Sequence, residues 1–171
     1  FSLLKTAGIP ASEVLQLART VVEGRLAQTE GDSNKAIERF EQAAALQDAL
    51  PYTEPPYWYY PVRQSLAAAL MQAGRLGDAE EQFRRALARA PNNGWTYYGL
   101  LELSKARGDA TGAQRAEAEL AKTWVGDRRQ LQSGLRLLLD QLVGSGRDTN
   151  ATRMAVSVLG LERRFLRTPG A

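Results

Sequence analysis

The sequence predicts an all-α protein built as a stack of helix-turn-helix units, and three observations carry this prediction. Alanine and leucine dominate the apolar residues, whereas β-branched residues alternating with polar ones are absent. Apolar residues instead recur three and four positions apart, the spacing of one helix face. Finally, Gly31, Gly74 and Gly108 each end a similar apolar segment, with spacings of 43 and 34 residues. The chain therefore contains an internal repeat.

Residues 1–13 form an N-terminal segment ahead of the first repeat. Pro10, Ser12 and Glu13 are typical of a helix start, so we expect a helix to begin here. We interpret residues 1–8 as the remnant of a preceding helix, and further repeats can precede it.

The first two repeats share a small residue five positions after the glycine and a phenylalanine four positions later. In the first repeat these are Ala36 and Phe40, and in the second Ala79 and Phe83. Small residues let paired helices approach closely, while an aromatic ring fills the space between them. The third repeat is degenerate: it has Ala113 at the small position, but Glu117 replaces the aromatic residue and Val125 replaces a terminal proline.

Residues 125–171 are predicted to form a basic helical hairpin that caps the stack. Two apolar stripes, each spaced i, i+4, i+7 and i+11, begin at Leu131 and at Met154. The turn-rich segment 144–150 lies between them. Residues 121–171 carry nine basic and four acidic side chains, whereas residues 1–120 carry 13 basic and 15 acidic ones.

The glycine, alanine and phenylalanine pattern resembles the tetratricopeptide repeat (TPR) family over residues 14–124, in particular the C-terminal part of larger bacterial TPR proteins with a segment like EPPYWYYPVRQSLAAAL. This resemblance implies a right-handed solenoid of about three repeats whose first helices line a concave groove. The groove positions implied in this chain are Val21, Arg25, Gln28, Gln64, Ala68, Met71, Tyr98, Glu102 and Lys105. This surface is mixed in charge and lacks the clustered donors that clamp a terminal carboxylate.

An insertion at residues 49–61 accounts for the longer first spacing and is rich in proline and aromatic residues. Two interpretations stay open. The rings of Tyr57, Trp58 and Tyr59 either cover the edge of the core between two repeats or form a rim that contacts a ligand. The same alternatives apply to Trp95, Tyr97 and Tyr98, which follow the turn at 91–94; packing is the favoured interpretation for most of these rings.

Catalysis has little support in the sequence. With no histidine and no cysteine, imidazole acid-base chemistry, cysteine nucleophiles and the usual zinc sites are excluded. The adjacent carboxylates Glu80 and Glu81 point in different directions on a helix and are typical of a solvated face. No phosphate-binding glycine loop is present. We therefore expect a protein that is not an enzyme and that has no cofactor and no metal.

The leading hypothesis is a non-catalytic scaffold that holds a peptide or helix of a protein partner in the groove. One alternative is a nucleic-acid-associated protein that uses the arginines of the C-terminal helices; nucleic acid is nevertheless the disfavoured partner, because a soluble capping face explains the same charges. Another is a recognition or assembly domain of a larger enzyme. Self-association through an open solenoid end is a further option. The arginines of the C-terminal helices are Arg128, Arg129, Arg136, Arg147, Arg153, Arg163, Arg164 and Arg167.

No apolar run is long enough to span a membrane, so we expect a soluble protein of the bacterial cytoplasm or periplasm.

Overall fold

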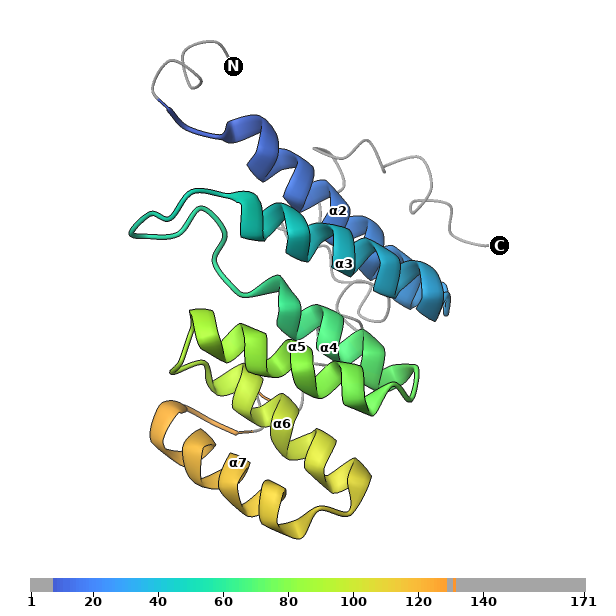
Figure 1. Ribbon diagram of the computed structural model, residues 1–171, viewed down its shortest axis with the longest axis vertical. Helices are drawn as coiled ribbons and strands as arrows, with labels where there is room; N and C mark the ends of the chain where they lie inside the picture. Colours follow the sequence, from blue (N-terminus) through green and yellow to red (C-terminus); the bar gives the residue numbers. More distant parts are fainter. Residues whose placement is uncertain (1–7, 129–130, 132–171) are drawn as a thin grey trace, which may run out of the picture.

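The computed structural model describes residues 8–128 and residue 131, and the described chain is all-helical (Figure 1). Six helices follow one another without any strand in this part of the chain. They are α2 (Ala11–Thr29), α3 (Ser33–Ala49), α4 (Val62–Gln72), α5 (Leu76–Arg89), α6 (Gly94–Arg107) and α7 (Ala110–Thr123).

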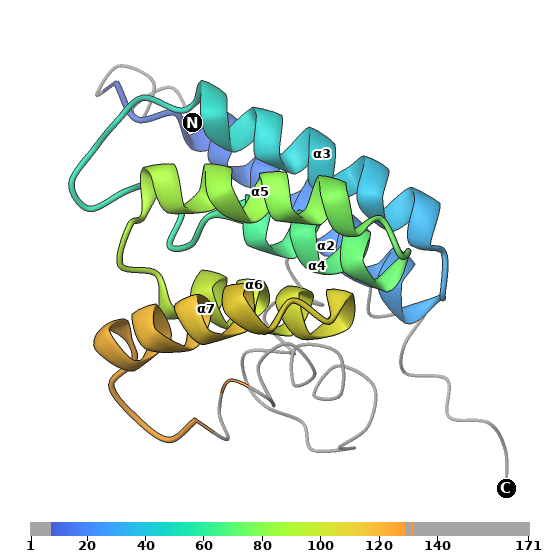
Figure 2. The ribbon, with the colours of Figure 1, turned by 60° about the horizontal axis from the view of Figure 1, so that its bottom comes forward.

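The helices are arranged as three antiparallel hairpins, α2 with α3, α4 with α5 and α6 with α7. In Figure 1 the hairpins follow one another from top to bottom, and Figure 2 shows α3 and α5 side by side on the same side of the stack. Helix α3 packs on α4, α5 packs on α6, and α4 also contacts α6. The arrangement is therefore a solenoid-like stack, as the sequence predicts.

Each hairpin turns at one of the three repeat glycines with the same backbone geometry. Gly31, Gly74 and Gly108 have φ of +78°, +75° and +69°, the left-handed region that favours glycine. The next residue's N–H donates to the carbonyl five residues earlier, at 2.9 Å in all three turns. Asp32 and Asp109 then cap α3 and α7 by accepting from the backbone N–H groups of Lys35 and Gly112.

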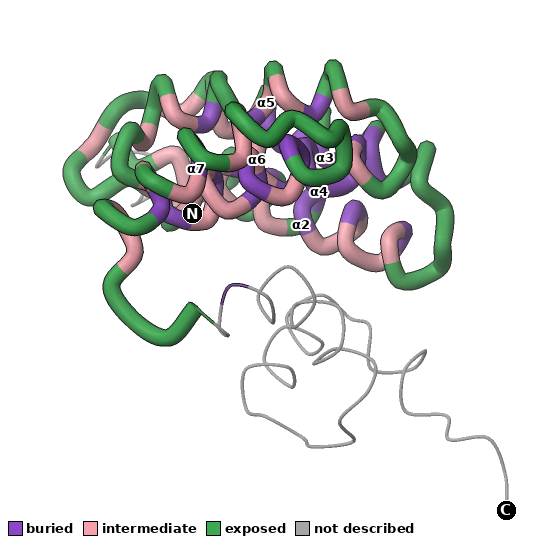
Figure 3. Tube along the Cα trace, turned by 90° about the horizontal axis from the view of Figure 1, so that it is seen from below, coloured by how far each residue is buried: buried purple, intermediate pink, exposed green. Residues whose placement is uncertain are grey.

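Phenylalanine rings packed against glycines form the centre of the core. Phe40 and Phe83 are 0% and 1% exposed. A Cβ added at Gly24 would lie 2.8 Å from the Phe40 ring, and one added at Gly99 would lie 2.3 Å from the Phe83 ring. Both glycines are therefore needed for close helix approach. Figure 3 shows the buried positions in the interior of the stack, between the neighbouring helices.

The third hairpin, which lacks the repeat phenylalanine, contains a pair of tryptophans. Trp124, just after α7, meets Trp95 edge to face with ring centroids 5.2 Å apart, and its ring also lies against Gly94. Leu101, Leu120 and Leu131 are buried beside this pair. The predicted C-terminal hairpin lies outside the described residues apart from positions 125–128 and Leu131.

Candidate functional site

The residues implied as groove positions lie on α2, α4 and α6, the first helices of the three hairpins. Val21 and Ala68 are each 7% exposed, so these two side chains belong to the core. Contrary to the expectation, they offer little surface to a partner. Met71 is half-buried and packs against the same core. The polar groove positions are therefore the ones whose geometry matters.

Arg25 and Gln28 of α2 hold the first hairpin to the second. Arg25 donates from Nη2 to Ser65 Oγ at 2.7 Å and from Nη1 to Gln28 Oε1 at 3.1 Å, and its guanidinium lies 5.1 Å from the centroid of the Phe40 ring. Gln28 Nε2 in turn donates to Gln72 Oε1 at 2.9 Å. The Arg25–Ser65 and Gln28–Gln72 bonds join α2 to α4, and the Arg25–Gln28 bond orients the two α2 side chains. Together these bonds fix the spacing of α2 and α4.

Tyr98, Glu102 and Lys105 form a polar and aromatic cluster on α6. Lys105 Nζ lies 2.8 Å from Glu102 Oε1, and this hydrogen bond raises the pKa of the lysine. Tyr98 packs against the core of the third hairpin, and burial, followed by the nearby Glu102 carboxylate, raises the pKa of its hydroxyl. Glu102 and Lys105 thus present a paired charge at the surface beside a partly buried ring.

The inserted loop, residues 50–61, is held at its C-terminal end by the side chain of Gln47. The amide nitrogen of Gln47 donates to the carbonyl of Tyr60 at 2.8 Å, and its oxygen accepts from the N–H of Val62 at 2.8 Å. Ser65 Oγ also donates to the Tyr60 hydroxyl at 3.3 Å. These contacts link the loop to the Arg25 and Ser65 junction.

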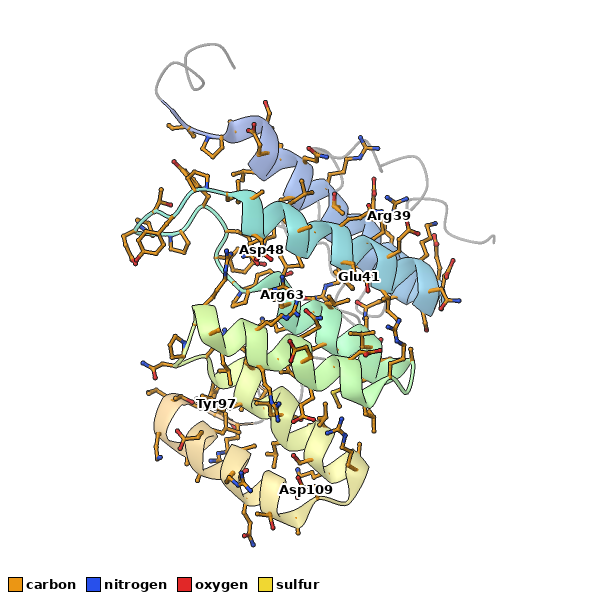
Figure 4. All side chains as sticks on the ribbon, viewed as in Figure 1. Arg39, Glu41, Asp48, Arg63, Tyr97 and Asp109 are labelled. Carbon is orange, nitrogen blue, oxygen red and sulfur yellow. The ribbon has the colours of Figure 1, made fainter. Side chains whose placement is uncertain are left out.

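Asp48 occupies the place of the terminal proline in the first repeat and binds two arginines. Arg63 of α4 donates to its Oδ2, and Arg89 of α5 lies 3.2 Å from its Oδ1. In Figure 4, Asp48 and Arg63 point toward one another between α3 and α4. This carboxylate therefore joins the first hairpin to both helices of the second.

The aromatic rings of the loop divide between packing and exposure. Trp58 packs against the core, and its ring contacts those of Tyr59 and Tyr60 in tilted arrangements, at centroid distances of 5.4 and 5.9 Å. Tyr52 and Tyr59, in contrast, are 85% and 80% exposed. Of the rim residues proposed from the sequence, Trp58 thus packs, Tyr57 is half-buried and Tyr59 is exposed. Trp95, Tyr97 and Tyr98 pack around the core of the third hairpin.

A cavity of about 530 Å³ lies between this loop and the C-terminal ends of α3 and α5. Its walls are Gln47 in the last turn of α3, Leu50 just after that helix, residues 51–54 and 56–61 of the loop, residues 88–90 and Asn93. In Figure 1 this region is the left edge of the stack, at the opposite end of the hairpins from the glycine turns. The cavity is therefore separate from the cluster on α6.

Three contacts of this region were missed by the sequence analysis: those of Gln47, Ser65 and Gln72. Each is a polar residue whose partner lies 13 to 44 positions away in the chain. Hydrophobic periodicity identifies which face of a helix is buried. These contacts depend instead on how far two packed helices are shifted along each other, which periodicity does not specify. The sequence signal for Ser65 is indirect, since it lies 34 positions before Gly99 at the same repeat position.

The remaining charged side chains of the described chain are mostly in surface ion pairs. Glu80 binds Arg84 and Arg107, and Glu81 binds Arg85 at 2.8 Å. Arg128 of the basic segment binds Glu117, whereas the other arginines of that segment lie outside the described residues. Within the described part of the chain no acidic cluster could hold a metal, and no helix is long and apolar enough to cross a membrane.

Comparison with known proteins agrees with the repeat geometry. Residues 61–103 match the tetratricopeptide repeat family model, a segment that covers α4, α5 and most of α6. The chain is also 44% identical over 52 residues to a high frequency lysogenization protein HflD homolog of Stenotrophomonas maltophilia (strain K279a), over 30% of this chain and 26% of that protein. The similarity thus spans about a quarter of the relative. No solved structure matches the chain. The chain resembles the TPR family in sequence and in its stacked helical hairpins.

Proposed function

We propose that this chain is a non-catalytic scaffold that binds a peptide or helix of a protein partner on the face formed by α2, α4 and α6. The TPR-type repeat supports a protein-interaction role, because stacked helical hairpins present extended surfaces of this kind. The observation that carries the proposal is the polar connection of the three helices. Arg25 and Gln28 bind across to α4, and Thr96 Oγ1 of α6 donates to Gln64 Oε1 of α4 at 3.5 Å.

This connection makes the face a preformed surface. A surface that is already ordered loses less conformational entropy when a partner binds, so more of the contact energy appears as affinity. The side chains available for contact are those of the α6 cluster, in which Tyr98 supplies ring area and Glu102 and Lys105 supply one charge of each sign. Such a surface fits an amphipathic helix or peptide better than a highly charged ligand.

The test is a quantitative pull-down from extract of the source cells with paired variants. The double variant Glu102→Ala and Lys105→Ala removes the ion pair of the proposed face. The matched control, Glu81→Ala and Arg85→Ala, removes an exposed helical ion pair from α5. Partners retained by the wild-type chain and by the control, and lost from the α6 variant, are expected.

Circular dichroism and thermal unfolding of both variants exclude a folding defect, because exposed ion pairs contribute only about 0–1 kcal/mol. Retention of the same partners by the α6 variant would show that binding takes place elsewhere on the chain.

A further inference from the structure

We infer that the outer side of α2 binds a second copy of this chain, with the two α2 helices packed antiparallel. Helix α2 carries apolar residues on two opposite sides. Leu17, Gly24 and Ala27 are buried on its core side. The opposite side carries a stripe with the spacing i, i+3, i+7 and i+11, formed by Leu15, Ala18, Val22 and Leu26. Leu15 is 49% exposed, and the other three are half-buried. Figure 1 shows α2 at one end of the described stack, with no described helix beyond it.

The repeat position of Val22 is one that the other two hairpins use to contact the preceding hairpin. The repeat spacings of 43 and 34 residues place Ser65 and Gly99 at this position. Ser65 is 3% exposed and accepts a hydrogen bond from Arg25 of the first hairpin, and Gly99 lies against the Phe83 ring of the second. This side of a first helix is therefore the side on which the fold places a neighbouring hairpin.

The repeat position of Leu26 shows the same pattern. Its equivalents, Ala69 and Leu103, are 1% and 2% exposed and belong to the core that the hairpins share. On α2 the same position holds a leucine that is only half-buried. Covering the stripe would remove apolar surface from water, which is the main favourable contribution to most protein associations. The stripe is therefore suited to a packed helix rather than to solvent.

Two charged residues on one flank make the stripe complementary to itself. Arg19 Nε lies 2.9 Å from Glu23 Oε1, and the arginine side chain is 74% exposed. In an antiparallel pair of helices related by a two-fold axis, this flank of one helix meets the same flank of the other. The midpoint of Leu15 and Leu26 lies between residues 20 and 21, and that of Arg19 and Glu23 lies at residue 21. One axis therefore brings Arg19 close to Glu23 of the second copy while the two stripes pack together.

The C-terminal end of the described stack offers a poorer fit to the same stripe. In a head-to-tail contact, the third hairpin of one copy would take the place of a preceding hairpin. The ring of Phe83 fills the contact between the second and third hairpins, but the third hairpin has Glu117 at that repeat position, bound to Arg128. Placing this carboxylate over an apolar stripe would remove its water without a gain in packing. The two-fold contact avoids this cost and closes at two copies.

The first experiment is sedimentation equilibrium of the 171-residue chain between about 1 and 500 µM. We expect an equilibrium between monomer and dimer. Val22→Glu should weaken the dimer at least about 10-fold, because the symmetry places the new charge twice in the contact. The matched control is Val125→Glu, since this valine is 97% exposed and lies outside α2. The α6 double variant should also form the dimer, so failure of this surface and failure of the proposed helix face are distinguishable. Circular dichroism checks that each variant keeps its helices.

The second experiment identifies the occupant by exchanging charges between two copies. Arg19→Glu alone places glutamates opposite Glu23 of the second copy, and Glu23→Arg alone places arginines opposite Arg19. Each variant should therefore dimerise at least about 10-fold more weakly than the wild type. An equimolar mixture of the two variants restores opposite charges across the axis, so native mass spectrometry should show heterodimers in excess of both homodimers.

Three results would overturn the proposal. A monomer at every concentration, or a dimer that Val22→Glu leaves unchanged, would show that the α2 stripe does not bind a second copy. Assemblies that grow beyond two copies would indicate a head-to-tail contact instead. A mixture of the two charge variants without excess heterodimer would exclude the antiparallel arrangement.

Discussion

The two junctions between hairpins solve the same packing problem in different ways. Ser65 and Gly99 lie 34 positions apart at the same repeat position, on α4 and α6. At the first junction, Ser65 accepts a hydrogen bond from Arg25, whose guanidinium lies over the Phe40 ring. At the second junction, Gly99 has no side chain and the Phe83 ring fills the space. One junction is therefore polar, and the other depends on close contact of a ring with backbone.

The repeat position that holds Arg25 on α2 also differs between the two junctions. Ala68 stands on α4 where the repeat places Arg25 on α2, and it is buried. The second junction thus lacks both members of the polar pair, the arginine and the hydroxyl. Arg25 with Ser65, and Ala68 with Gly99, are best understood as two matched sets. A repeat position therefore constrains a pair of residues, and a substitution of one member alone should be unfavourable in either direction.

The largest expected effect comes from removing the ring at the second junction. Phe83→Ala should lower the free energy of unfolding by about 3–5 kcal/mol, because a fully buried ring is lost and a cavity remains. Phe40→Ala should cost a similar amount, but it also removes the surface under the Arg25 guanidinium. Urea unfolding followed by circular dichroism measures both. A loss below about 1 kcal/mol for Phe83→Ala would mean that α6 collapses onto α5 and that the ring is not required.

Placing the serine of the first junction at the second junction tests the matched sets directly. Gly99→Ser places a Cβ 2.3 Å from the Phe83 ring, so we expect a loss of about 1–3 kcal/mol in the free energy of unfolding from overpacking. This loss should exceed any gain from replacing a helical glycine, which is about 0.5–1 kcal/mol. Combining Gly99→Ser with Phe83→Leu should recover part of the stability. A Gly99→Ser variant as stable as the wild type would show that the second junction has room for the side chain.

Removing the hydroxyl at the first junction should have a smaller effect. Ser65→Ala leaves the Arg25 guanidinium with its bond to Gln28 and with access to water, so a loss of about 0.5–1.5 kcal/mol in the free energy of unfolding is expected. The control is Thr29→Ala, which removes an exposed hydroxyl bonded within its own helix and should change stability less. Equal losses for the two variants would indicate that the hydrogen bond between α2 and α4 adds nothing to this junction.

The sequence predicts the parts of this structure that depend on local chemistry. Gly31, Gly74 and Gly108 are recognisable because a left-handed turn residue ends each first helix, and Phe40 and Phe83 because their spacing from those glycines is constant. The contact of Trp124 with Trp95 was missed, because Trp124 lies beyond α7 and outside the repeat pattern.

The candidate site was predictable only in outline. The inserted loop is visible in the sequence as a proline and aromatic segment, but which rings pack and which are exposed depends on its attachment to Gln47. That attachment joins residues of two different hairpins, and no periodic pattern encodes it. The burial of Val21 and Ala68 follows from the tilt and depth of each helix in the stack, which position numbers in a repeat do not specify.

The smallest predicted effect concerns an ion pair that bridges the second junction. Glu80 of α5 binds Arg107 of α6, and the hydrogen bond from Arg107 lowers the pKa of the Glu80 carboxyl despite an opposing contribution from burial. A carboxyl with a lowered folded-state pKa stabilises the protein above its unfolded-state pKa, and this stabilisation is lost as the pH falls through the folded-state value. Glu80→Gln should therefore cost up to about 1 kcal/mol at pH 7, and the difference from wild type should shrink as the pH falls below the ordinary pKa of a glutamate.

Urea unfolding at pH 7 and at acidic pH measures this difference in the free energy of unfolding. The control is Glu81→Gln, because Glu81 pairs within its own helix and bridges no junction. A Glu80→Gln penalty that stayed constant across this pH range would indicate a packing role for the side chain in place of a charge that joins the two hairpins.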